Sequence, residues 1–175
     1  MNGYDSIFST IDVRSFSSIW FWIAVAVAWS NTTHFILGVP FDMVQRAKRR
    51  GGTVMEDLEV LTMIQVRRRL QIIRSGGVWL VAFWSAILTT LAMLGFGYGH
   101  ELAQALTLLL LPLTLAAWLG LRMAARFEAD PPSGAALTRA LTLHRLLIQG
   151  IGLLAILITT MWGSWFNLTL RMFGG

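Results

Sequence analysis

Four long runs of apolar residues constrain this chain more than any other feature. They cover approximately residues 18–38, 76–98, 102–122 and 145–169. A helix rises about 1.5 Å per residue, so roughly 20 residues cross the roughly 30 Å hydrocarbon core of a bilayer. The second and third runs are so close in sequence that they must form a tight antiparallel hairpin. The prediction is an all-α polytopic membrane protein with four transmembrane helices.

The composition also indicates a protein that resides in a bilayer. Of the 175 residues, 55% are hydrophobic and 13% are charged, whereas a soluble domain carries about 25% charged residues. The chain contains no cysteine. This excludes disulfides, zinc held by thiolates and a cysteine nucleophile within the chain.

The basic residues are distributed unevenly between the two predicted sides of the membrane. Of the 14 Lys and Arg residues, eight lie between the first and second helices and four lie around the connection from the third to the fourth. One precedes the first helix and one follows the last. Cytoplasmic loops carry the excess of Lys and Arg. We therefore expect a multi-pass protein of the bacterial inner membrane with both termini periplasmic.

This topology predicts how the chain is organised. Residues 1–17 form a periplasmic N-terminal segment, and residues 18–175 form a single membrane domain. Within that domain, residues 39–75 and 123–144 form a cytoplasmic helical layer, which the sequence Asp130-Pro131-Pro132 interrupts because proline breaks a helix. The layer is too small to be an independent catalytic domain.

The sequence VPFDMVQRAKRRGG, residues 39–52, predicts a short interfacial helix. Pro40 suits its first turn and the glycine pair ends it. Its apolar side, with Phe41 and Val44, is expected to lie on the bilayer, and each cation near an anionic surface contributes about 1 kcal/mol. Nucleic-acid binding is the less favoured alternative, because topology already requires the charge and no aromatic residues interleave with the bases. The expected contacts with lipid or a partner are Phe41, Arg46, Lys48, Arg49 and Arg50.

A separate cytoplasmic helix is predicted over residues 54–74. Thr53 and Glu56 have the spacing of a capping box, and acids at the start and arginines at the end complement the helix dipole. The apolar residues are not confined to one stripe, so the helix is expected to pack against protein. That protein is either a partner subunit or the base of the bundle, and both alternatives stay open. The expected contact residues are Leu61, Ile64, Arg67, Arg68 and Arg69.

The sequence offers little for catalysis or for binding a cofactor. It contains no metalloprotease, hydrolase or phosphate-loop motif. His34 and His144 could ligate a haem iron from facing helices, but each lacks a second histidine on its own helix. Asp42, Glu56, Asp57 and Glu59 are interpreted as capping and surface charge. We therefore expect no enzymatic activity, no cofactor and no metal.

Three stretches of the chain resemble an uncharacterised family of bacterial four-helix inner-membrane proteins. They are WFWIAVAVAWSNTTHFILGVPFDMVQRAKRRGG, EDLEVLTMIQVRRRLQIIRSGGVWL and LGFGYGHELAQALTLLLLPLTL. The resemblance covers approximately residues 4–125. Members of that family are sometimes labelled as a component of the SUF iron–sulfur assembly complex. The resemblance implies a protein partner and provides no catalytic residue.

These observations favour a non-catalytic membrane accessory or assembly subunit. Its basic cytoplasmic layer would contact a membrane or cytoplasmic protein partner, or anionic membrane lipids. The alternative is a small helper subunit of a membrane transporter or channel, and a membrane-embedded enzyme is third.

Overall fold

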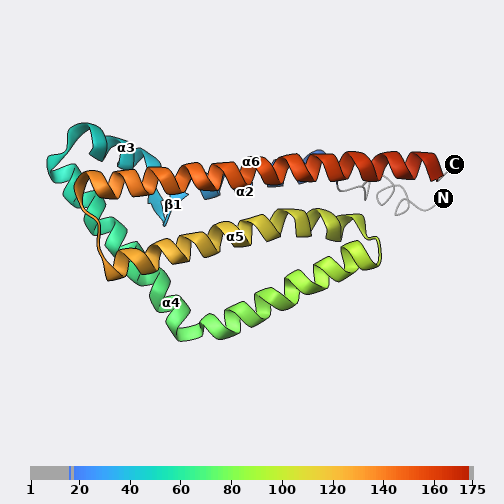
Figure 1. The fold of residues 1–175 in the computed structure, drawn as a ribbon, viewed down its shortest axis with the longest axis horizontal. Coiled ribbons are helices and arrows are strands. Elements are labelled where there is room, and N and C mark those ends of the chain that lie inside the picture. The colour runs from blue at the N-terminus through green and yellow to red at the C-terminus, as the bar shows by residue number, and fades with distance from the viewer. Residues whose placement is uncertain (1–15, 17, 174–175) are drawn as a thin grey trace, which may run out of the picture.

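A computed structural model describes residue 16 and residues 18–173 (Figure 1). All residues of the predicted segment 1–17 except Phe16 therefore lie outside the described part of the chain. The described elements, in chain order, are α2 (Ile19–His34), β1 (Phe35–Ile36), β2 (Val39–Pro40), α3 (Phe41–Arg50), α4 (Gly52–Ala92), the π-helical turn η2 (Met93–Gly97), α5 (Glu101–Ala129) and α6 (Gly134–Phe173). The prediction of an all-α protein is confirmed.

The helices form an elongated bundle with a layer at one end (Figure 1). Helices α2, α5 and α6 enclose one apolar core along the bundle, to which Val25, Leu109 and Ile148 belong. A second core lies at the end that carries α3, and α3, α4, α5 and α6 all contribute to it. The second half of α4 adds no residue to either core.

Three helices are long and apolar enough to cross a membrane: α4 with η2, then α5 and α6. The protein is therefore a multi-pass membrane protein. The first predicted crossing is shorter than expected, because α2 has 16 residues and ends at His34, which gives about 24 Å. The predicted end at residue 38 is wrong. The chain turns at Leu37 and Gly38, with φ of 53° and 85°, and β1 pairs with β2 in an antiparallel hairpin.

The predicted helices at 54–74 and 76–98 are one continuous helix, α4, which η2 extends to Gly97. The helix changes direction sharply partway along (Figure 1). Ser75, Gly76 and Gly77 provide a physical reason, because Gly and Ser residues weaken the resistance of a helix to bending. The predicted capping box is not formed. The helix begins one residue before Thr53, with Gly51 as its N-cap at φ 60° and no side-chain capping bond.

The predicted hairpin between α4 and α5 is confirmed. Its close approach depends on Gly95, where a Cβ atom would lie 2.7 Å from the backbone nitrogen of Gln104. The Gln104 side chain donates a hydrogen bond to the Gly95 carbonyl at 2.9 Å and accepts one from the Trp162 indole at 2.9 Å. One buried amide therefore ties the hairpin to α6.

Helices α5 and α6 are longer than the apolar runs that predicted them. Helix α5 ends at Ala129 and α6 begins at Gly134, so the predicted break at Asp130-Pro131-Pro132 is confirmed. Helix α6 has 40 residues, which corresponds to about 60 Å, or twice the hydrocarbon thickness. Its first three turns extend into the layer at the α3 end of the bundle (Figure 1).

Candidate functional site

The end of the molecule that carries α3 presents a cluster of exposed cations. We call α3 together with residues 52–74 of α4 the basic layer. The ion pair found among the described residues joins Arg74 to Glu128 at 2.7 Å, so the other cations of the layer have no carboxylate partner there. The exposed cations without such a partner are Arg46, Lys48, Arg49, Arg50, Arg67 and Arg68.

Helix α3 does not rest its apolar side on a bilayer. Phe41, Val44 and Ala47 are buried in the layer's own core. The guanidinium of Arg145 on α6 lies 3.8 Å from the centre of the Phe41 ring, in a cation–π contact. The expectation that Phe41 and Val44 contact lipid is therefore wrong, because α4 and α6 cover them.

The first half of α4 is covered on one side by the protein itself. Its buried residues recur at intervals of four, so they lie on one face of the helix. They are Leu58, Thr62, Val66 and Leu70. Glu59 is not simply surface charge, because its carboxylate accepts a 2.6 Å hydrogen bond from the backbone nitrogen of Gly134 and so holds the first residue of α6.

The predicted contact pair Leu61 and Ile64 is split between two environments. Leu61 is half-buried and packs against the layer's core. Ile64 is 54% exposed, and Val60, one turn earlier, is 60% exposed. The bundle therefore covers part of the helix, while the Val60 and Ile64 side chains remain available to another surface.

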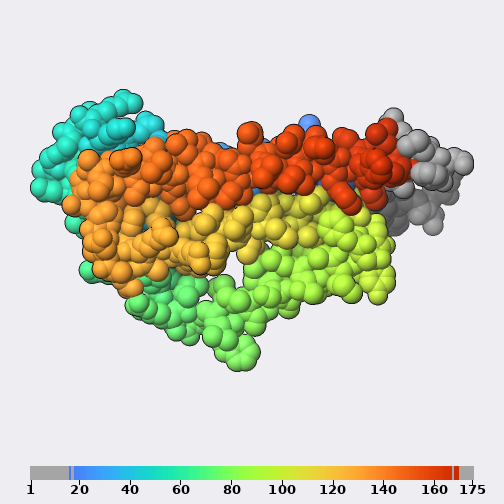
Figure 2. All heavy atoms as spheres, viewed as in Figure 1, coloured from blue at the N-terminus to red at the C-terminus, as the bar shows by residue number. Residues whose placement is uncertain are grey.

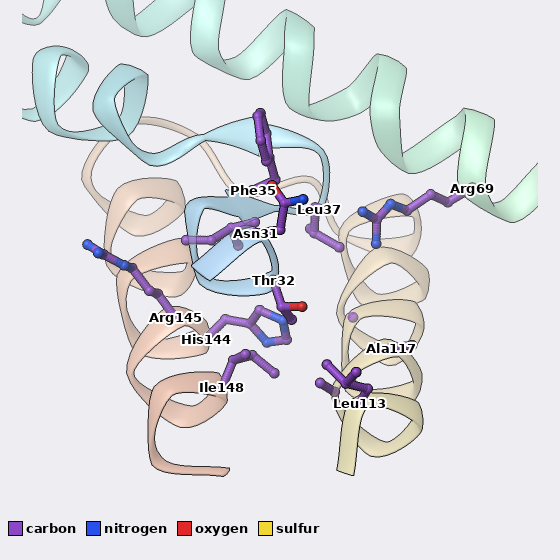
Figure 3. Close-up of a pocket in the computed structure, with 13 residues that line it drawn as sticks. Asn31, Thr32, Phe35, Leu37, Arg69, Leu113, Ala117, His144, Arg145 and Ile148 are labelled. Carbon is purple, nitrogen blue, oxygen red and sulfur yellow. The ribbon is translucent and has the colours of Figure 1, made fainter. Parts of the chain in front are cut away.

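A cavity of about 530 Å³ lies beneath the basic layer, between α2, α5 and α6. Arg69 reaches towards it from α4, and the His144 imidazole points into it from α6 (Figure 3). Asn31 and Thr32 line it at the end of α2. The sequence placed Arg69 with Arg67 and Arg68 as surface contacts, but only Arg69 is half-buried; the other two are exposed.

The electrostatics of this cavity are one-sided. Burial lowers the pKa of Arg69, although an arginine remains protonated at neutral pH. Burial, and then the positive charge of Arg69, lowers the pKa of His144. Both residues lie outside the apolar stretches of their helices, and no acidic side chain lines the cavity. The cavity therefore combines the fixed positive charge of Arg69 with an imidazole whose pKa is lowered.

Arg145 belongs to the cavity only through its aliphatic stem. Its guanidinium points away, on the other side of α6 (Figure 3), where it meets Phe41. Its Nε atom is buried without a hydrogen-bond partner among the described residues.

An apolar groove of about 450 Å³ adjoins this cavity. It runs between α5 and the second half of α4, from Ile73 to Leu88 on the α4 side, and Figure 2 shows a hollow between these two helices. Leu113 and Ala117 of α5 line both the cavity and the groove. The two spaces therefore border the same part of α5, with basic groups lining one and apolar side chains lining the other.

The candidate haem ligands do not form a metal site in this structure's described residues. His34 is exposed and stacks edge-on against Phe35 at 4.8 Å, whereas His144 points into the cavity (Figure 3). Within residue 16 and residues 18–173, no three His, Cys, Asp or Glu side chains gather in a group that could hold a metal ion.

Glu101 and Gln104 have structural roles that the sequence did not reveal. The Glu101 carboxylate accepts a 2.7 Å hydrogen bond from the backbone nitrogen of Phe16, and Gln104 joins the hairpin to α6. Both bonds connect residues distant in sequence, so local patterns could not predict them.

Comparison of the chain with models of protein families, with curated proteins and with solved structures finds no match in any of the three.

Proposed function

We propose that this protein is a non-catalytic accessory or assembly subunit of the bacterial inner membrane, with its basic layer on the cytoplasmic leaflet. The observation that carries the proposal is the gathering of six exposed cations at one end of a membrane-spanning bundle. Anionic lipids attract such cations, each for about 1 kcal/mol.

In this proposal α2 also crosses the membrane. It is the first of four crossings in chain order, and both termini are periplasmic. Two contacts support its path alongside α6: a Cβ atom on Gly152 would meet the Trp29 ring at 2.7 Å, and one on Gly163 would meet Phe16 at 3.0 Å. Helix α2 thus runs antiparallel to the apolar part of α6 and covers the same depth. Its modest length is compatible with crossing, because a bilayer thins locally around a short helix at a small cost.

The partner would contact the exposed part of the first half of α4. Val60 and Ile64 offer apolar area there, and Arg67 and Arg68 lie on the exposed side one turn further along. The family that the chain resembles suggests an iron–sulfur assembly component as the first partner to test. A transporter or channel as the partner would favour the helper-subunit alternative instead.

Topology is tested with reporter fusions after Gly51 and after Gly175. The proposal expects a cytoplasmic signal at residue 51 and a periplasmic signal at residue 175. The opposite signal at either position would refute the topology.

Partner contact is tested by copurification in mild detergent. The double variant Val60→Asp/Ile64→Asp is expected to lose the partner and keep the thermal stability of the wild type, because both side chains are exposed. Gln71→Asp, also exposed on α4, is the matched control and is expected to keep the partner. If the double variant retains every protein that copurifies with the wild type, this contact surface is wrong.

A further inference from the structure

We propose that the cavity beneath the basic layer and the adjoining apolar groove form one binding site for a single anionic phospholipid, whose phosphate lies at Arg69 and His144 and whose acyl chain lies between α4 and α5. This inference rests on the proposed function only in placing this end of the bundle at a membrane surface.

The first argument is the uncompensated charge of Arg69. Its side chain is half-buried and reaches into the cavity, and the described residues provide no carboxylate for it. A charge removed from water is costly unless a counter-charge and hydrogen bonds accompany it. A phosphate satisfies that need, because a guanidinium donates two parallel hydrogen bonds to it.

The second argument is the set of polar groups around Arg69. An anion bound next to His144 raises the pKa of the imidazole, because a nearby negative charge stabilises the imidazolium. Asn31 adds an amide group from α2. Thr32 also lines the cavity, but its hydroxyl already donates a 2.7 Å hydrogen bond to the Ala28 carbonyl. Donors from three helices thus converge on one space, as expected for recognition of an anionic group and not for a loose surface attraction.

The third argument distinguishes a lipid from a free anion. The groove that shares Leu113 and Ala117 with the cavity is lined by hydrocarbon side chains and two indoles, with Ser85 and Thr114 as its polar residues. The Thr114 hydroxyl is already engaged, since it accepts a 2.8 Å hydrogen bond from the Trp84 indole and donates to the Leu110 carbonyl. A free phosphate would leave this groove unused, whereas an acyl chain would fill it.

The depth of the two spaces also matches a lipid. The cavity lies at Arg69 and His144, just before the apolar stretches of α4 and α6 begin, where headgroups lie. The groove extends from there along α4 as far as Leu88, which is further towards the middle of the bundle. A phospholipid in a bilayer is arranged in the same order, with its phosphate at the surface and its hydrocarbon chains towards the middle.

The experiment is native mass spectrometry of the whole protein in detergent. The protein is titrated with palmitoyl-oleoyl phosphatidylglycerol, with phosphatidylcholine of the same acyl chains, and with inorganic phosphate. We expect one phosphatidylglycerol to bind more tightly than phosphatidylcholine. Arg69→Gln is expected to weaken that binding about tenfold, since it removes charge-assisted hydrogen bonds. The matched control, Arg139→Gln, removes an exposed arginine of α6 that lines neither the cavity nor the groove and is expected to leave the binding unchanged.

A second variant tests the groove. Ala117→Trp places a large side chain at a residue that lines both the cavity and the groove. It is expected to abolish retention of phosphatidylglycerol. Its control is Ala125→Trp, at an exposed position of the same helix that lines neither space. If Arg69→Gln fails to fold, two results still test the proposal. They are the preference of the wild type for phosphatidylglycerol and the loss of that preference in Ala117→Trp.

Two results would overturn the proposal. Equal binding of phosphatidylglycerol and phosphatidylcholine would refute recognition of the anionic group. Binding of inorganic phosphate as tight as that of the lipid, and unchanged in Ala117→Trp, would show a site for a free anion. Both readouts are made in detergent, so they stand whether or not the reporter fusions confirm the proposed topology.

Discussion

The two halves of α4 belong to one continuous helix, yet different surroundings hold them. In residues 52–74, the line of buried side chains that begins at Leu58 faces the core of the basic layer. In residues 76–92, Gly77 is the one buried residue, and Val78 and Trp79 are both 82% exposed. The first half packs into the core of the basic layer, whereas the second half exposes most of its apolar side chains and is joined to α5 by the hydrogen bond from the Trp84 indole to the Thr114 hydroxyl. Apolar sequence alone therefore does not indicate a protein core in a membrane chain.

The largest effect that separates the two halves is expected from truncating a buried and an exposed side chain. Leu58→Ala should lower the free energy of unfolding by about 2–5 kcal/mol, because it opens a cavity in the core of the layer. Val78→Ala should change it little, because its side chain is 82% exposed and packs against no other part of the protein core. Reversible unfolding in mixed micelles measures both. Equal losses would mean that another protein surface covers the second half of α4.

The next effect concerns the polar link that holds the far end of α4. Gln104 is 4% exposed and bonds to both Gly95 and Trp162. Gln104→Leu should cost about 1–2 kcal/mol, because each hydrogen bond between membrane helices contributes on the order of 0.6 kcal/mol and the Gly95 carbonyl loses its partner.

The same unfolding assay measures this loss, with Gln149→Leu as the control, since Gln149 is exposed on α6. A loss no greater than that of the control would show that lipid alone positions this end of α4.

The long apolar helices were easier to predict from the sequence than the turns and contacts between the helices. Length and hydropathy were enough for α5, and the Asp130-Pro131-Pro132 break followed from proline chemistry. The end of α2 was not predictable, because its turn depends on a positive φ at Leu37, a residue that rarely adopts one. The continuity of α4 was missed because glycines that suggest an interruption in a soluble helix are tolerated in membrane helices.

The sequence also did not indicate which single residues would line the cavity. Arg67, Arg68 and Arg69 are chemically identical neighbours in the sequence, and only helical phase separates them. Arg69 lies beside Leu70 and Val66 on the buried face, so it reaches the cavity while the other two face outwards. The four-residue spacing from Leu58 to Leu70 carries this information. The contribution of Asn31 and His144 comes from other helices and required the three-dimensional structure.

The first half of α4 should also introduce a pH dependence that the second half lacks. The charged groups around His144 are all basic; they line its two adjoining cavities and are Arg69, Arg122, Arg126 and Arg145. Burial and then Arg69 lower the pKa of His144 in the folded protein. As pH falls below 6.5, the value of an ordinary histidine, the unfolded chain binds the proton first, so stability is lost.

Thermal unfolding in detergent without anionic lipid measures this effect over the pH range just below 6.5. His144→Asn should remove the part of the slope that His144 contributes. His34→Asn, at an exposed position on α2, is the control and should leave the slope unchanged. If the two variants have the same slope, His144 is not responsible for the loss.

The smallest expected effect lies at the junction of the two halves of α4. Arg74, immediately before Ser75 and the glycine pair, donates two hydrogen bonds to Glu128 of α5, at 3.1 and 2.7 Å. The side chains are 69% and 32% exposed, so water and salt screen the pair, and its coupling energy should be only about 0.2–1 kcal/mol. A double-mutant cycle of Arg74→Gln and Glu128→Gln measures it, and Arg68→Gln with Glu128→Gln is the control cycle.

The coupling should decrease as salt is raised, because the charges are exposed. A coupling above about 2 kcal/mol that salt does not reduce would contradict this view and show that the ion pair, and not the packing around Leu70, fixes the end of the protein-held half.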